Sequence, residues 1–270
     1  MVVGSFLNVV IYRLPIMMHK AWRKECCEFL EVDEDKDVDE QHYSLVFPNS
    51  QCPKCQHKIR AWENIPLISY LFLRGRCSSC HTSISIRYPV IEILSGVLSL
   101  IIAWKFGFSL ALIPALFLTW ALIALSFIDI DHQLLPDDIT LPFLWLGLLC
   151  NVFAIYTDIY SSVIGAVAGY MSLWLVYISF KIVTGKEGMG HGDFKLLALL
   201  GAWMGWQVLP VIIILSSLCG AIIGVSMILF GGHDRKQAIP FGPYLAMAGW
   251  IAFIWGQEIT NAYSLWMLSP

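Results

Sequence analysis

Residues 109–136 read SLALIPALFLTWALIALSFIDIDHQLLP, and this stretch indicates the class of fold. Its first part, 109–128, contains no charged side chain. Because a helix needs about 20 mostly apolar residues to cross the hydrocarbon core of a bilayer, this part predicts a membrane-spanning helix. Asp129 and Asp131 follow at once. Carboxylates beside hydrocarbon are costly, so these two residues are candidates for a functional site.

The composition extends this pattern to the whole chain. Apolar residues make up 57% of the 270 residues and charged residues only 14%, whereas a soluble domain carries about 25% charged residues. The net charge of -3, with no long basic run, argues against a nucleic-acid-binding protein. The sequence therefore predicts an all-α polytopic membrane protein with about eight transmembrane helices, although seven crossings stay possible. The hydrophobic segments lie at 1–13, 89–105, 109–128, 139–156, 160–182, 194–207, 209–231 and 241–261.

Charged residues are concentrated near the start of the chain. Of the 37 charges, 21 lie between Arg13 and Tyr88. We therefore expect a short first membrane helix at 1–13, a polar domain at 14–88 and a multi-helix membrane domain at 89–270. Within the polar domain, the acidic stretch 31–40 is typical of a solvated linker, and 17–30 could form a helix on the membrane surface.

The distribution of Lys and Arg predicts the orientation. With eight crossings, 16 of the 17 basic residues fall on one side of the membrane. Cytoplasmic loops near helix ends retain such residues, so this side is predicted to be the cytoplasm. It would carry the polar domain and the loops 129–138, 181–195 and 231–240. Seven crossings would move Arg235 and Lys236 to the opposite side.

Four cysteines form two C-x2-C pairs, Cys52 with Cys55 and Cys77 with Cys80. Each pair can direct two thiolates at one metal, and two pairs complete a tetrahedral Zn²⁺ site. Such a closed site is structural, and a metal would compensate for the small core of this domain. Two disulfides are the alternative, which a reducing cytoplasm disfavours.

Two loops on the predicted cytoplasmic side carry the most informative carboxylates. Asp129 ends one apolar segment, and Asp193 lies in the glycine-rich stretch GKEGMGHGDFK at 185–195. A helix C-terminus disfavours the anion of Asp129, whereas Asp138 is expected to cap the helix near Ile139, and Asp193 has the alternative of capping one near Phe194. If Asp129 and Asp193 meet, they can share one proton and perform aspartic-protease chemistry.

Other chemistries have less support in the sequence. Neither the H-E-x-x-H motif of zinc metalloproteases nor the G-x-S-x-G nucleophile elbow is present. A transporter with aspartates along an ion path, and a non-catalytic scaffold of a secretion machine, are alternative functions. A second metal site is a further alternative, and its ligands would be Asp129, Asp131, His132, His191 and Asp193.

The chain resembles the bacterial type IV prepilin peptidases, also called prepilin leader peptidase/N-methyltransferases. Six stretches carry the resemblance in the family's order and spacing. They are GSFLNVVIYRLP at 4–15, PNSQCPKCQHKIRAWENIPLISYL at 48–71, RCSSCHTSISIRYPVIE at 76–92, IDIDHQLLPD at 128–137, GKEGMGHGDFK at 185–195 and IPFGPYLA at 239–246. The resemblance therefore spans nearly the whole chain.

The resemblance implies an inner-membrane aspartic endopeptidase whose catalytic pair is Asp129 and Asp193. Its substrates would be type IV prepilins and the pseudopilins of type II secretion, cleaved after a Gly that follows a basic leader. The new N-terminal residue, commonly Phe, would then be methylated with S-adenosylmethionine. The four cysteines would hold zinc in the cytoplasmic domain linked to methylation. Gly75 is a weak candidate for contact with the methyl donor, and Asp131, Asp137 and Asp138 could attract the basic leader.

Overall fold

The computed structural model describes residues 1–31, 43–52, 54–60, 63, 65–186, 188–230 and 239–268. Within these ranges every regular element is helical, which confirms the all-α prediction, and two isolated β-bridges join Gln51 to Lys58 and Arg76 to Ser83. The chain divides into two compact units, Met1–Leu100 and Ile101–Pro270. The predicted acidic linker lies almost entirely outside the described residues.

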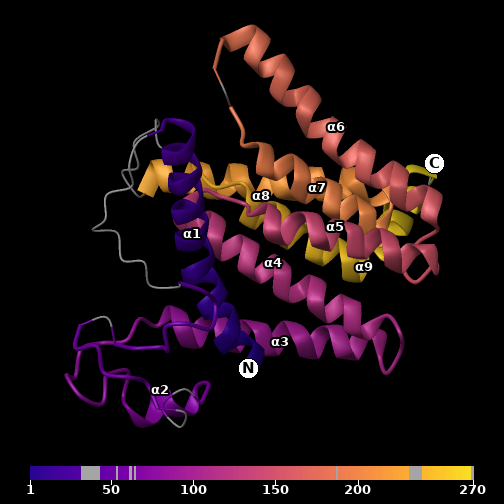
Figure 1. The fold of residues 1–270 in the computed structure, drawn as a ribbon. Helices are drawn as coiled ribbons and strands as arrows, with labels where there is room; N and C mark the ends of the chain where they lie inside the picture. The colour runs from indigo at the N-terminus through magenta and orange to yellow at the C-terminus, as the bar shows by residue number, and fades with distance from the viewer. Residues whose placement is uncertain are drawn as a thin grey trace. The chain divides into compact units, whose positions relative to one another are not determined.

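Figure 1 shows the helices in chain order along the described chain. They are α1 (Val2–Phe29), α2 (Ile68–Phe72), α3 (Arg87–Phe106), α4 (Leu112–His132), α5 (Asp137–Val152), α6 (Ile159–Thr184), α7 (His191–Met204), the 3-10 turn η2 (Trp206–Val208), α8 (Leu209–Phe230) and α9 (Gly242–Leu268).

Several of these helices are long and apolar enough to cross a membrane, so the protein is a multi-pass membrane protein. Among the described residues there are five such segments: Val2–Phe29, Arg87–Phe106, Leu112–His132, Ile159–Thr184 and Trp206–Met227. Helices α5 and α7 contain 16 and 14 residues. At about 1.5 Å per residue they are shorter than the hydrocarbon core of about 30 Å. The predicted total of eight crossings is not confirmed and stays a prediction.

Helix α1 continues well past the predicted end of the first segment at residue 13. Arg13 does not end the helix because its buried guanidinium donates to the carbonyl oxygens of Ser44 at 3.0 Å and Pro48 at 2.6 Å. Pro15 lies inside the same helix. The stretch 17–30, expected to form a separate surface helix, is the second half of α1 up to Phe29.

Helix α7 is the centre of the second unit. Six of its large side chains are fully buried: Phe194, Leu196, Leu197, Leu199, Leu200 and Trp203. A helix that is apolar on all sides is expected inside a bundle, and α7 packs against α5, α6 and α9. Helix α6 lies very close to α7 at Gly165 and Gly201, where a Cβ added to either glycine would overlap the backbone of the other.

The buried Asn151 fixes the far end of α7. Its amide nitrogen donates to the carbonyl oxygens of Ala202 at 2.8 Å and Trp203 at 3.1 Å. Its oxygen accepts from the backbone N–H groups of Tyr156 at 3.1 Å and Thr157 at 3.2 Å. Because buried polar groups need partners, this one side chain joins the end of α7 to the chain that follows α5. Because these hydrogen bonds hold the end of α7 in place, they also help to position Asp193 at its start.

Candidate active site and metal centre

Asp129 lies in the last turn of α4, as predicted, and is only 6% exposed. The helix ends at His132, and Gln133 then adopts a left-handed conformation with a φ of 52°. The backbone N–H of Gln133 donates to the Asp129 carbonyl oxygen at 2.9 Å. The chain therefore turns sharply just after Asp129 and leads to Leu135, which is buried.

Asp193 lies in the first turn of α7 and is 7% exposed. The prediction that Asp138 caps its helix is wrong, and the alternative that Asp193 caps its own is not supported. Helix α5 begins at Asp137 with Pro136 at its N-cap, and α7 begins at His191 with Gly190 at its N-cap. Pro136 and Gly190 have extended backbone and directly precede the helices, so both helices start earlier in the chain than predicted. Asp138 and Asp193 therefore lie inside the first turn of their helices. An anion is still favoured there by the helix dipole.

Leu135 brings the two aspartate loops together. A Cβ added to Gly192, the neighbour of Asp193, would lie 2.8 Å from the Leu135 Cβ. A Cβ added to Gly242 would lie 3.2 Å from the Leu135 Cδ2 and 2.7 Å from the Asp129 Oδ2. Leu135 thus packs between the start of α7 and the start of α9, and the latter abuts Asp129.

The two carboxyl groups interact electrostatically. Burial raises the pKa of Asp193 to about 7, and the negative charge of Asp129 contributes to the rise. Like charges close together in a buried site disfavour double ionisation. This disfavours two negative charges in the pair, and a pair of carboxyl groups that shares one proton is the arrangement that aspartic proteases use. Geometrically, the structure brings together the two aspartates that the sequence singled out.

Polar residues around the pair already have partners. Lys195, two residues beyond Asp193, donates to both oxygens of Asp137 at 2.8 and 2.7 Å. His191 stacks on Phe194 with ring centroids 5.4 Å apart and meets Tyr177 edge-on at 5.3 Å. Lys195 therefore balances the charge of Asp137 and links the first turn of α5 to α7 just after its first turn.

One residue at this site was missed by the sequence analysis. The backbone N–H of Gly242 donates to the Asp129 Oδ2 at 2.9 Å in a buried hydrogen bond. Gly242 belongs to the stretch IPFGPYLA, which was noted for its resemblance but given no role. The signal was the glycine before Pro243 at the start of an apolar segment, because glycine permits close approach of the backbone.

The second candidate site is formed by Cys52, Cys55, Cys77 and Cys80. Their four sulfur atoms lie within 4.8 Å of one another, and the described residues contain no other such cluster of potential metal ligands. The Cys52 and Cys80 sulfurs are 3.7 Å apart, and those of Cys55 and Cys77 are 3.9 Å apart. Both distances far exceed the disulfide length of about 2.05 Å. All four cysteines are free, so the disulfide alternative has no support here.

These distances fit a tetrahedral metal site. A tetrahedron of sulfurs about 2.3 Å from Zn²⁺ has edges of about 3.8 Å. The two C-x2-C turns also share a backbone hydrogen-bond pattern. The N–H of Cys52 donates to the His57 carbonyl oxygen and the N–H of Cys77 to the Thr82 carbonyl oxygen, both at 2.9 Å. The cluster can therefore bind a metal ion with little rearrangement. The second metal site, named above as an alternative around Asp129 and Asp193, has no support, because the described residues contain no second cluster of potential metal ligands.

Gly75 has a structural reason to be glycine. It adopts a φ of +67°, and an added Cβ would lie 3.0 Å from the ring of Tyr70. Its N–H donates to the Tyr70 carbonyl oxygen at 2.9 Å, and its own carbonyl oxygen accepts from Ile84 at 2.7 Å. Whether Gly75 contacts the methyl donor stays a prediction.

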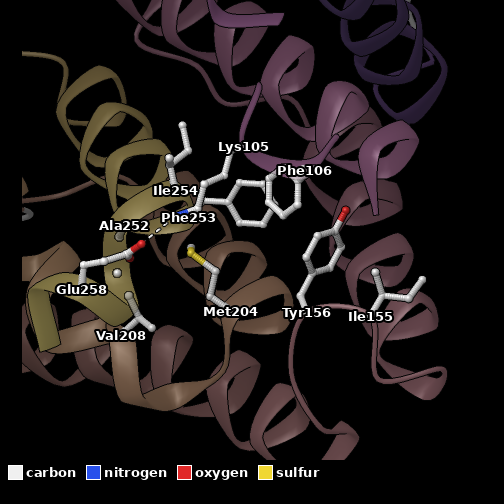
Figure 2. Close-up of a pocket in the computed structure, with 11 residues that line it drawn as sticks. Lys105, Phe106, Ile155, Tyr156, Met204, Val208, Ala252, Phe253, Ile254 and Glu258 are labelled. Carbon is white, nitrogen blue, oxygen red and sulfur yellow. Dashed lines mark hydrogen bonds and ion pairs between the residues drawn. The ribbon is translucent and has the colours of Figure 1, made fainter. Parts of the chain in front are cut away.

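A pocket of about 190 Å³ lies in the second unit, away from the aspartates. Figure 2 shows Phe106, Tyr156 and Phe253 on its wall and the Lys105–Glu258 ion pair, 2.6 Å long, at one side. The pocket includes Met204 at the last residue of α7, whereas Asp193 is in the first turn. At about 1.5 Å per residue these positions are about 16 Å apart along the helix axis. The pocket is therefore separate from the candidate active site.

Comparison with known proteins gives a consistent result along the chain. Residues 1–106 match the family described as Bacterial Peptidase A24 N-terminal domain, and residues 116–225 match the Type IV leader peptidase family. Proteins named prepilin leader peptidase/N-methyltransferase are 56% identical in Stutzerimonas stutzeri and 55% identical in Pseudomonas aeruginosa, each alignment covering 97% of this chain and 90% of the relative. The one from Neisseria gonorrhoeae is 48% identical over 100% of this chain and 93% of its own length. No solved structure matches.

Proposed function

Because this chain belongs to the type IV leader peptidase family, we propose that it is a membrane aspartic endopeptidase that removes the leader of type IV prepilins. We also propose that it N-methylates the residue exposed by cleavage, the second activity in the name of its relatives. The observation that carries the peptidase proposal is the buried pair of Asp129 and Asp193, only 6% and 7% exposed.

This pair suits amide hydrolysis. The ionised member takes a proton from a water molecule that attacks the scissile carbonyl, and the protonated member donates to the carbonyl oxygen. The raised pKa of Asp193, caused by burial and by Asp129, keeps a proton available at about neutral pH. Proton transfer by positioned groups of this kind contributes about 10²- to 10⁴-fold to a rate.

We propose that the pair faces the cytoplasm in the bacterial inner membrane. The distribution of Lys and Arg along the sequence supports this orientation. A prepilin keeps its basic leader in the cytoplasm while its apolar segment enters the membrane, so the scissile bond would meet the pair at the interface. Pseudopilins of type II secretion share this arrangement and are proposed as further substrates. Asp131, Asp137 and Asp138, all exposed, would attract the basic leader.

We propose that the four cysteines hold one Zn²⁺ ion with a structural role. Cys52, Cys55, Cys77 and Cys80 would supply four thiolates, and the measured sulfur separations of 3.7 and 3.9 Å support this assignment. A bound zinc would join the two C-x2-C turns and supply folding free energy to a region with little regular structure. Four thiolates leave no coordination position for substrate, so zinc would not take part in hydrolysis.

S-adenosylmethionine is proposed as the methyl donor, without assignment of its binding residues. The name of the relatives includes an N-methyltransferase activity, which supports a donor of this kind. When bound, it would supply the methyl group to the new terminal amine. Gly75 stays a candidate contact from the resemblance, and its φ of +67° beside the Tyr70 ring gives it a structural reason to be glycine as well.

The proposal can be tested with the purified full chain in lipid nanodiscs. The substrate is a prepilin with a basic leader and a Gly-Phe junction, supplied with S-adenosylmethionine and analysed by intact mass. We expect loss of the leader and gain of one methyl group on the new terminus. A control prepilin in which Val replaces the junction Gly should stay uncleaved. Absence of cleavage of the Gly-Phe substrate by the wild-type protein would contradict the proposed function.

A further inference from the structure

The contact between Gly242 and Asp129 distinguishes the two aspartates. Gly242 is the first residue of α9, and the first N–H groups of a helix have no acceptor within their own helix. Here that N–H donates to the Asp129 Oδ2 at 2.9 Å. The start of α9 also carries the positive end of its helix dipole. An anion at the C-terminus of α4, which α4 itself disfavours, is thus stabilised by a second helix.

Only glycine permits this contact. A Cβ at position 242 would lie 2.7 Å from the Asp129 Oδ2, closer than real Cβ atoms approach other atoms, and 3.1 Å from the Asp129 Cγ. On its other side it would lie 3.2 Å from the Leu135 Cδ2. Position 242 therefore requires glycine because there is no room for a side chain between its backbone and the Asp129 carboxylate.

Asp193 lacks an equivalent donor. In the described part of the chain, no hydrogen bond reaches its carboxyl oxygens, and its backbone N–H turns back to the Gly190 carbonyl oxygen at 3.3 Å. Lys195 gives its ammonium to Asp137. Asp193 shares with Asp129 the benefit of a helix N-terminus, but only Asp129 receives a direct N–H bond. Hydrogen bonds to an ionised acceptor are roughly twice as strong as neutral ones, so the negative charge is favoured on Asp129.

We propose that the Gly242 amide fixes the negative charge on Asp129, which makes Asp129 the general base and leaves Asp193 as the general acid. This assignment rests on the proposed peptidase function. Gly242 is a positioning residue in this scheme, because it acts through Asp129.

The steps follow from these roles. The water oxygen bonds to the scissile carbonyl carbon while one water proton passes to Asp129 and the Asp193 proton passes to the carbonyl oxygen. The resulting tetrahedral diol carries no net charge. It then collapses as the C–N bond breaks, the proton on Asp129 moves to the leaving nitrogen, and one diol hydroxyl returns its proton to Asp193. Both aspartates end in their starting states.

The charge assignment can be read by chemical labelling of the wild-type enzyme. An epoxide is opened by an ionised carboxylate, whereas a diazoacetyl compound must first take a proton from a carboxylic acid. Full-length protein in nanodiscs is treated at pH 6 with each reagent attached to a prepilin-like peptide, and the esterified residue is mapped by mass spectrometry. We expect the epoxide on Asp129 and the diazoacetyl group on Asp193. The reverse pattern, equal labelling of both residues, or no epoxide on Asp129 in a protein that cleaves prepilin would overturn the assignment.

A pair of glycine variants tests the role of the amide. Gly242→Ala should lower kcat by about 100-fold, the scale of general acid–base catalysis, with KM nearly unchanged, and should spread the epoxide label over both aspartates. Gly220→Ala is the matched control, because its added Cβ would touch Tyr244 at 3.3 Å near the start of α9 without reaching Asp129. The control should keep the wild-type kcat and labelling pattern. Wild-type labelling and kcat in Gly242→Ala would refute the role of Gly242, while an inactive wild type would instead contradict the proposed function.

Discussion

Asn in place of Asp193 should abolish cleavage and, at alkaline pH, make the protein more stable. Raising the pKa of Asp193 from 3.8 to about 7 means that the folded chain holds this proton more tightly than the unfolded chain does. Well below pH 3.8 the Asp193 carboxyl is protonated in both the folded and the unfolded chain, so it does not lower the stability of the folded state. As the pH rises toward 7, the unfolded chain releases its proton first, so the folded state loses relative stability. At 1.36 kcal/mol per pKa unit, the loss reaches about 4 kcal/mol at pH 8.

Asp193→Asn removes this loss because the amide is neutral at every pH and matches the protonated acid in shape. The variant should therefore unfold with a free energy about 4 kcal/mol above that of the wild type at pH 8, and the difference should nearly vanish at pH 4. The assay is reversible denaturant unfolding in detergent, followed by tryptophan fluorescence. Asp138→Asn, at an exposed position in the first turn of α5, is the control and should change stability by no more than about 0.5 kcal/mol. Equal stability of Asp193→Asn and wild type at pH 8, or an equal gain at both pH values, would refute the reasoning.

Three further changes test the metal site and the packing around α7. Cys52→Ser should reduce the zinc content from one ion per chain, measured by mass spectrometry of the metal, and an unchanged zinc content would rule out a four-thiolate site. Gly201→Ala should lower the unfolding free energy by about 1–3 kcal/mol because its Cβ overlaps the backbone of Gly165, whereas Gly224→Ala, which would touch only the Ile239 side chain at 3.3 Å, should have a much smaller effect. Asn151→Ala should cost about 2–4 kcal/mol in the same measurement, since it removes the side-chain acceptor of the Tyr156 and Thr157 N–H groups and a donor to the Trp203 carbonyl oxygen. A loss below about 1 kcal/mol would show that these groups find other partners.

The meeting of Asp129 and Asp193 could be predicted because both lie where apolar segments end, on the side that collects the basic residues. Helix ends on the same side of a membrane protein lie in one layer, which favours contact between them. A carboxylate beside hydrocarbon is costly, so its presence indicates a function. The spacing of the cysteines was equally informative, because C-x2-C turns impose a local geometry that does not depend on the rest of the fold.

Gly242 could not be assigned a role from the sequence. Its contribution is a backbone N–H, which every residue except proline possesses, and its acceptor lies far away in the sequence. Helix starts were also misjudged by a few residues. Asp138 is a good capping residue by type, yet Pro136 takes the N-cap of α5 because its extended backbone precedes the helix directly. Residue preference at caps is a weak guide when a proline stands two positions earlier.

The length of α1 shows a further limit of composition. Arg13 appeared to mark the end of an apolar segment, but its charge is buried against backbone carbonyl oxygens of residues 44–48. Hydropathy alone does not reveal such partners. Hydropathy does not give the number of crossings for a related reason: α5 and α7 are apolar yet short, and the α7 side chains are buried by other helices.

The most direct test of the central claim compares wild type with Asp129→Asn and Asp193→Asn in nanodiscs, using the Gly-Phe prepilin and reading leader removal by mass. The account predicts that both variants insert into the membrane and retain zinc but leave the prepilin intact. Leader removal by either variant at a rate near that of the wild type would contradict the assignment of Asp129 and Asp193 as the catalytic pair.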